Sequence, residues 1–175
     1  MSEPTTNEPA TEREPTISWE GRFFEDFHVG DVYRHPHGRT ITETDNTWFT
    51  LLTNNSHDIH YNADYASKTE FGRPLVVSTL TLAIVTGLSV TDVSQNAVAN
   101  LGWDDVKLTA PVFAGDTLYA ESEVLAKRES KSRADAGIVS VRSTGKNQNG
   151  DVVCTFDRTM LVQRRGHALE DKANY

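Results

Sequence analysis

The chain has 175 residues and a formal net charge of −8 at pH 7, a length that suits one domain with a sizeable apolar core. The acidic balance argues against nucleic acid as a main partner, because neutralising phosphates requires a basic surface. The single cysteine, Cys154, excludes an internal disulfide and fits a reducing cytoplasm, which is the location we expect. The alternating run VVCTFDRTMLV around it indicates a small core residue rather than a reactive thiol.

Both ends of the chain are polar. Residues 1–18 are acidic, rich in Pro and Thr and without the apolar centre of a signal peptide, so we expect a disordered tail. Residues 166–175 indicate a second polar tail, which leaves residues 19–165 as the folded domain. The longest apolar run, residues 74–90, is shorter than the ~20 residues that span a bilayer, so no membrane partner is expected.

The folded part is predicted to open with aromatic residues and extended chain. Phe23, Phe24 and Phe27 are expected to pack on the core. Residues 29–31 (VGD) indicate a turn, and residues 32–42 (VYRHPHGRTIT) indicate one or two extended segments.

Helices are predicted next. Thr44 is expected to cap a short helix that ends at residues 54–55, and a second short helix is expected over residues 64–69. FGRP at 71–74 then breaks the chain and leads into a helix over residues 74–90. Because that helix is apolar on most sides, we expect the fold to enclose it.

Four segments rich in Val, Thr, Ile and Leu follow. They alternate in part between apolar and polar residues, turn signals separate them, and they predict four strands in an antiparallel meander. The segments are residues 98–109, 116–130, 136–148 and 151–165. The expected layout is α+β, with a curved antiparallel sheet wrapped around the apolar helix.

Four histidines between residues 35 and 60 raise the question of a metal site, because imidazole is a good ligand for borderline metals. They are His35, His37, His57 and His60. A cupin-like site would need an acid soon after His-x-His, but Glu43 lies too far along and no second motif follows. We therefore predict no metal.

The stretch TNNSHDIH at residues 53–60 carries the most specific signal. With YASKTEFGRPLV at residues 65–76 and PVFAGDTLYAESEV at residues 111–124, it resembles the MaoC-like (R)-specific enoyl-CoA hydratases and dehydratases. Their motif runs Ser-Gly-Asp-x-Asn-Pro-Ile-His before a helix and an Arg-Pro break. The resemblance covers roughly residues 19–165 and is closest to the branch that includes mesaconyl-CoA hydratase, also called methylmalyl-CoA dehydratase.

This resemblance implies a single hot-dog domain that assembles as a homodimer, with the acyl chain at the subunit interface. It implies reversible hydration of a 2-enoyl-CoA that is short, branched or carries a second carboxylate. No cofactor is implied beyond the coenzyme A of the substrate itself.

The family's catalytic aspartate and histidine correspond to Asn55 and His60. His60 is expected to act as acid and base, since imidazole titrates near neutral pH. An amide cannot accept a proton, so Asn55 is expected to orient water or substrate, with Asp58 as a possible substitute carboxylate. In the alternative interpretation, Asn55 and Asp58 only brace the turn.

Other substrate contacts also follow from the resemblance. The backbone N–H of Ser78 matches the family's oxyanion donor at the start of the central helix. Thr86 matches a residue lining the acyl pocket, although a hydroxyl in a helix often bonds back to its own backbone. The run KRESKSR is assigned to the coenzyme A phosphates, with a solvated hairpin as the alternative; its basic residues are Lys127, Arg128, Lys131 and Arg133.

Two other functions remain open at this point. A hot-dog thioesterase would share fold and ligand, but those enzymes place an acid near or on the central helix, and the run from Pro74 to Val90 has none. A non-catalytic acyl-CoA-binding protein is the second alternative, and Asn55 in place of an aspartate keeps it open.

Overall fold

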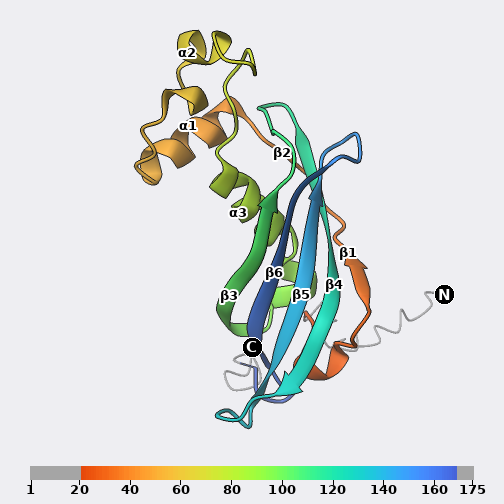
Figure 1. Ribbon diagram of the computed structural model, residues 1–175. Coiled ribbons are helices and arrows are strands. Elements are labelled where there is room, and N and C mark those ends of the chain that lie inside the picture. The colour runs from red at the N-terminus through yellow and green to blue at the C-terminus, as the bar shows by residue number, and fades with distance from the viewer. Residues whose placement is uncertain (1–20, 169–175) are drawn as a thin grey trace, which may run out of the picture.

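The computed structural model describes residues 21–168 (Figure 1). The predicted N-terminal tail, residues 1–18, lies outside the described residues, as does most of the C-terminal tail. In chain order the elements are η1 (Phe24–Asp26), β1 (Val32–Arg34), β2 (Arg39–Thr40), α1 (Glu43–Leu52), η2 (Asp58–His60), α2 (Ala63–Ser67), α3 (Ser78–Leu88), the π-helical turn η3 (Val90–Ser94), β3 (Ala97–Leu108), β4 (Thr117–Glu129), β5 (Ala136–Lys146) and β6 (Val152–Gln163).

The strands form one antiparallel sheet in the order β1-β4-β5-β6-β3, with β2 also paired to β4. β4, β5 and β6 make the predicted meander, but the expectation that β3 would pair with β4 is wrong. β3 pairs with β6, and Trp103 stands opposite Arg158. The reason is residues 109–116, which cross the end of the sheet and bond to the chain before α3 through Val76 N–H and Val112 O at 2.9 Å.

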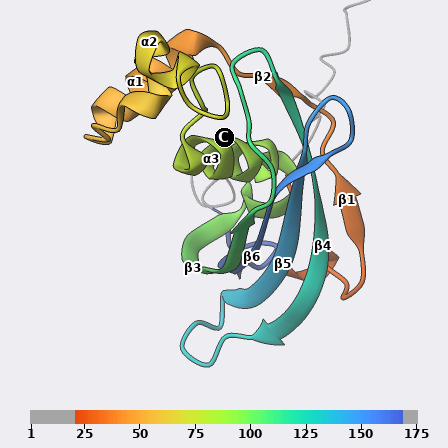
Figure 2. The ribbon, with the colours of Figure 1, turned by 45° about the horizontal axis from the view of Figure 1, so that its top comes forward.

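α3 lies along the concave side of the sheet, with α1 and α2 beyond one end (Figures 1 and 2). It contacts β4, β5 and β6. The approach to β5 is close, because a Cβ on Gly145 would lie 2.5 Å from a methyl of Val85. This α+β arrangement is the hot-dog layout expected from the sequence.

The sequence predicts that α3 is enclosed on all sides, but in the structure one face of it is open. Leu80, Thr81 and Val85 are buried, but Ala83 and Gly87 are exposed on the opposite side. One sheet covers only one face of a helix, so within a single chain the other face of α3 stays open.

The start of α1 also differs from expectation. Its N-cap is Thr42, not Thr44. Thr42 has an extended backbone, its Oγ1 accepts from the Asp45 N–H at 3.1 Å, and the Asp45 carboxylate accepts from the Thr42 N–H at 2.8 Å. This reciprocal capping box satisfies two amide donors at once, which a cap at Thr44 would not.

The core confirms the aromatic and cysteine predictions. Phe23, Phe24 and Phe27 are each at most 5% exposed, and the Cys154 side chain is fully buried. Burial raises the pKa of the Cys154 thiol to about 11, so it stays protonated and unreactive at neutral pH. None of the helices within residues 21–168 has the length and apolar character needed to cross a membrane.

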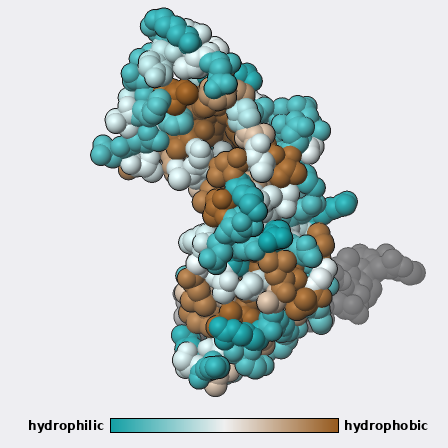
Figure 3. All heavy atoms as spheres, viewed as in Figure 1, coloured by the Kyte–Doolittle hydropathy of each residue, from teal (hydrophilic) through white to brown (hydrophobic). Residues whose placement is uncertain are grey.

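β3 is an open edge. It is exposed along most of its length, including Leu101 at 53% and Trp103 at 43%. Its pairing with β6 shifts register three times, and Asp105 takes a left-handed φ of 49°. The space-filling view shows apolar patches among polar residues both at the helical end and over the sheet (Figure 3).

Candidate functional site

The polar loop after α1 is largely self-bracing. Asn54 takes a left-handed φ of 54°, which asparagine tolerates better than most residues. Asn55 Oδ1 accepts from the His57 N–H at 3.1 Å, and His57 Nδ1 accepts from the Ile59 N–H at 3.2 Å. Asn62 Oδ1 caps α2 by accepting from the Tyr65 N–H. Many of these polar side chains therefore replace backbone partners in a tight turn.

His60 is the exception. Its Nδ1 lies 3.0 Å from the Leu75 carbonyl oxygen. A carbonyl oxygen only accepts, so Nδ1 carries the proton and the neutral ring presents an unprotonated Nε2. Within residues 21–168 no hydrogen-bond partner for Nε2 is found. The ring therefore has one nitrogen fixed by backbone and one free to exchange a proton.

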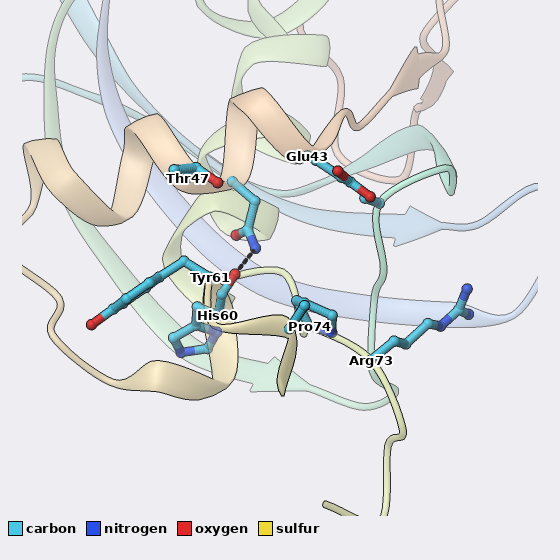
Figure 4. A pocket seen from close by; sticks show the side chains of 9 residues that line it. Glu43, Thr47, His60, Tyr61, Arg73 and Pro74 are labelled. Carbon is cyan, nitrogen blue, oxygen red and sulfur yellow. Dashed lines mark hydrogen bonds between the residues drawn. The ribbon is translucent and has the colours of Figure 1, made fainter. Parts of the chain in front are cut away.

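His60 lines two adjoining cavities. The first, of ≈ 250 Å³, lies between α1 and the loop (Figure 4), where Glu43 and Thr47 face His60, Arg73 and Pro74. The second, of ≈ 290 Å³, lies between the start of α3 and the crossover after β3, and it is lined by His60, Phe71, Leu75, Val76, Ser78, Thr81, Leu108, Thr109, Ala110, Pro111 and Val112. This second cavity is mostly apolar, with few polar groups, as in small-molecule sites.

Ser78 shares the second cavity with His60. It is the first residue of α3, where backbone N–H groups have no partner within the helix. In the described chain no hydrogen bond to the Ser78 N–H is found. A donor at a helix N-terminus favours negative charge. A histidine with one unbonded ring nitrogen and a residue with an unbonded backbone donor thus border the same space.

Asn46 was missed by the sequence analysis. It is 4% exposed, and its side chain makes three hydrogen bonds. Its Nδ2 donates to the His60 carbonyl at 2.7 Å, the dashed line in Figure 4, and to the Leu75 carbonyl at 2.9 Å. Its Oδ1 accepts from the Val77 N–H at 2.9 Å. One hint of its role was available, because Asn46 lies four residues before Thr50 and therefore on the same face of α1.

Asn55 and Asp58 border neither cavity. Besides desolvation, the Asp58 carboxylate raises the pKa of the Tyr61 phenol, which places that carboxylate beside Tyr61. The Tyr61 hydroxyl donates to the Ser56 carbonyl at 3.0 Å. Within one chain Asn55 therefore braces the loop, and the catalytic roles expected for Asn55 and Asp58 stay predictions.

Thr86 is half-buried, lies in the last turn of α3, and borders neither cavity. Its carbonyl accepts from the Ser89 hydroxyl at 2.7 Å. Its predicted contact with the acyl chain also stays a prediction.

The basic run lies at the opposite end of the sheet from His60, around the β4–β5 hairpin (Figure 1). The thirteen residues of β4 separate the two ends by about 40 Å at ~3.3 Å per residue. Lys127 Nζ donates to the Phe27 carbonyl at 2.9 Å, Arg128 to the Glu129 carbonyl, and Arg133 forms a two-pronged pair with Asp135. Lys131 is exposed at the turn. The structure does not bring these residues to the His60 cavities of the same chain.

His35 belongs to a separate buried network. Its Nδ1 lies 2.9 Å from the Asp92 carboxylate and its Nε2 2.9 Å from the Ser122 hydroxyl. Arg22 donates to the other Asp92 oxygen at 2.9 Å. Although desolvation opposes it, hydrogen bonding from His35 and Arg22 holds the pKa of Asp92 below its usual range. Between residues 21 and 168 no three His, Cys, Asp or Glu side chains gather in a metal-binding group.

Comparisons with known proteins show the family of the chain. The family model for mesaconyl-CoA hydratase matches residues 1–174. The chain is 35% identical over 148 residues to the mesaconyl-CoA hydratase of Cereibacter sphaeroides, covering 85% of this chain and 43% of that protein. It is 37% identical over 145 residues to the β-methylmalyl-CoA dehydratase of Chloroflexus aurantiacus, covering 83% and 41%.

A solved structure of a MaoC domain dehydratase from Chloroflexus aurantiacus superposes with a TM-score of 0.80 at 36% identity, over 86% of this chain and 43% of that one. The chain thus spans less than half the length of these relatives. The matched family model, the sequence identities and the shared fold together place the chain in the mesaconyl-CoA hydratase family.

Proposed function

We propose that the chain catalyses reversible hydration of a short, branched or dicarboxylic 2-enoyl-CoA such as mesaconyl-CoA. One observation carries the proposal: the free Nε2 of His60 and the unbonded N–H of Ser78 belong to residues that line one cavity. The relatives named as mesaconyl-CoA hydratase and β-methylmalyl-CoA dehydratase support the reaction class.

In the hydration direction, His60 Nε2 takes a proton from water while the water oxygen bonds to C3 of the enoyl group. The electron pair of the double bond moves toward the thioester, whose oxygen gains negative charge beside the Ser78 N–H. The protonated His60 then delivers a proton to C2. Dehydration is the same path reversed. Asn55 keeps its Oδ1 in the loop and has its NH₂ group left to orient the water.

A second copy of the chain is part of the proposal. The open edge of β3 and the uncovered face of α3 leave apolar surface around Trp103 exposed, and pairing two such edges would close the acyl pocket. The phosphate role of the basic run depends on this second copy, since the run lies far from His60 in its own chain.

The deciding experiment is the loss of absorbance at the enoyl-thioester band with crotonyl-CoA and mesaconyl-CoA, run beside a free-thiol assay. Loss of the band without thiol release supports hydration. Thiol release identifies a thioesterase. Binding with neither signal identifies a non-catalytic acyl-CoA protein and overturns the proposal.

A further inference from the structure

We infer that Asn46 is a positioning residue that holds the base and the oxyanion donor in one hydrogen-bonded unit. The inference rests on the proposed function. Asn46 sits on α1, an element separate from both the His60 loop and the start of α3, and it bonds to backbone groups of each.

The polar groups of Asn46 are committed to these contacts. An amide side chain has two N–H donors and one carbonyl acceptor. Both donors go to carbonyls, those of His60 and Leu75, and the oxygen takes the Val77 N–H. No donor is left for a substrate, although Asn46 borders the first cavity. Asn46 therefore acts through its neighbours.

The first neighbour is the base. The Leu75 carbonyl accepts one hydrogen from Asn46 Nδ2 and one from His60 Nδ1. Fixing that carbonyl fixes the ring nitrogen that carries the proton, and the direct bond to the His60 carbonyl fixes the backbone beneath the ring. Asn46 thereby stabilises the tautomer that leaves Nε2 free.

The second neighbour is the anion donor. Val77 is the N-cap residue of α3 and has no side-chain cap of its own. Asn46 Oδ1 takes the Val77 N–H, which holds the start of the helix. The next amide, that of Ser78, has no hydrogen-bond partner among residues 21–168. A neutral amide suits this place because a carboxylate would face two carbonyl oxygens.

Two variants test the inference. Asn46→Ala removes all three bonds. Asn46→Asp keeps the shape and the acceptor for Val77 but loses both donors, so it decides the question if the alanine variant does not fold. Thr50→Val is the matched control, because Thr50 lies on the same helix, is 1% exposed, and its hydroxyl bonds only to α1 carbonyls.

The readouts are steady-state hydration and the ¹⁵N shifts of the His60 ring, assigned by their loss in His60→Ala. We expect Asn46→Asp to lower kcat on the order of 10²-fold with KM changed by less than about threefold. Its His60 ring should become a mixture of tautomers, whereas Thr50→Val should match wild type in both readouts.

Wild-type kcat and ring shifts in the folded Asn46 variants would overturn the inference, as would equal losses in Thr50→Val. If the wild type hydrates no enoyl-CoA, the proposed function fails. The ring shifts then still decide whether Asn46 sets the His60 tautomer.

Discussion

His60 and His35 are two well-held histidines with opposite uses. His35 has a fully buried side chain, and both ring nitrogens are bonded, to Asp92 and to Ser122. His60 has one ring nitrogen bonded to a carbonyl and the other without a partner among residues 21–168, and the residue lines both cavities. The His35 side chain has no exposed surface, so a substrate cannot reach it and its two bonds hold the structure together. A ring with one fixed and one free nitrogen is oriented and still able to exchange a proton.

The largest expected effect on activity is that of His60→Ala. We expect kcat/KM for the preferred enoyl-CoA to fall by ~10² to 10⁴ because proton transfer is lost, while the fold is kept. Circular dichroism and thermal melting should stay close to wild type, since only one side-chain bond is removed. Hydration within about threefold of wild type would remove His60 from the mechanism.

Asp92→Asn tests how much the His35–Asp92 pair contributes to the stability of the fold. Because the pKa of Asp92 is lowered in the folded protein, the charged carboxylate stabilises the fold above the unfolded-state pKa of about 4, and this contribution is lost as the pH falls through the folded-state value. At pH 7 we expect the variant to lose about 1.5–3 kcal/mol in free energy of unfolding. The gap should narrow in acid, with activity per folded molecule retained.

Asp135→Asn is the matched control for that measurement. Hydrogen bonding to Arg133 lowers the pKa of Asp135 to about 2, but the pair is exposed and screened by water. The control should change unfolding far less than Asp92→Asn. If Asp135→Asn lost as much free energy of unfolding as Asp92→Asn, the contribution of Asp92 would follow from its lowered pKa alone and not from its burial beside His35.

Variants of Asn55 test whether this residue orients water beside His60 or only braces the loop. If its NH₂ group orients water, Asn55→Ala should lower kcat/KM by about tenfold or more. Asn55→Asp should be tolerated or raise activity, because it recreates the acid-histidine pair of the resembling hydratases. Should initial-rate measurements find both variants equal to wild type, Asn55 only braces the turn and Asp58 is the residue to test next.

The smallest expected effect belongs to the basic run. Replacing its four basic residues with Gln should raise KM several-fold for every acyl-CoA and leave kcat nearly unchanged, because phosphate contacts are the same in ground and transition states. The wild-type KM should rise with salt and that of the variant should rise less. Identical KM values at low salt would identify a solvated hairpin.

Local patterns predicted much of the fold. Alternation located four strands and apolar composition located α3, because both depend on which residues face a core. The position of β3 beside β6 was not predictable, since strand order depends on where residues 109–116 cross. Thr42 and Thr44 offered two caps in one short stretch, and only the reciprocal bonds with Asp45 distinguish them.

The residues of the site were also predictable only in part. His60 and Ser78 were found through a sequence motif and do border one cavity. Asn46 was missed because its partners are backbone groups up to 31 residues away, which carry no side-chain signature. The pairing of His35 with Asp92 spans 57 positions and left no local trace either.

The irregularity of β3 limits which strands can pair with its open edge. An open strand edge is a template for any passing strand and a common origin of aggregation. Three register shifts and a left-handed residue at Asp105 interrupt its ladder and increase its twist. A flat strand from a misfolded chain would meet mismatched donors and acceptors along this edge. The irregularity therefore protects an open edge from unspecific pairing.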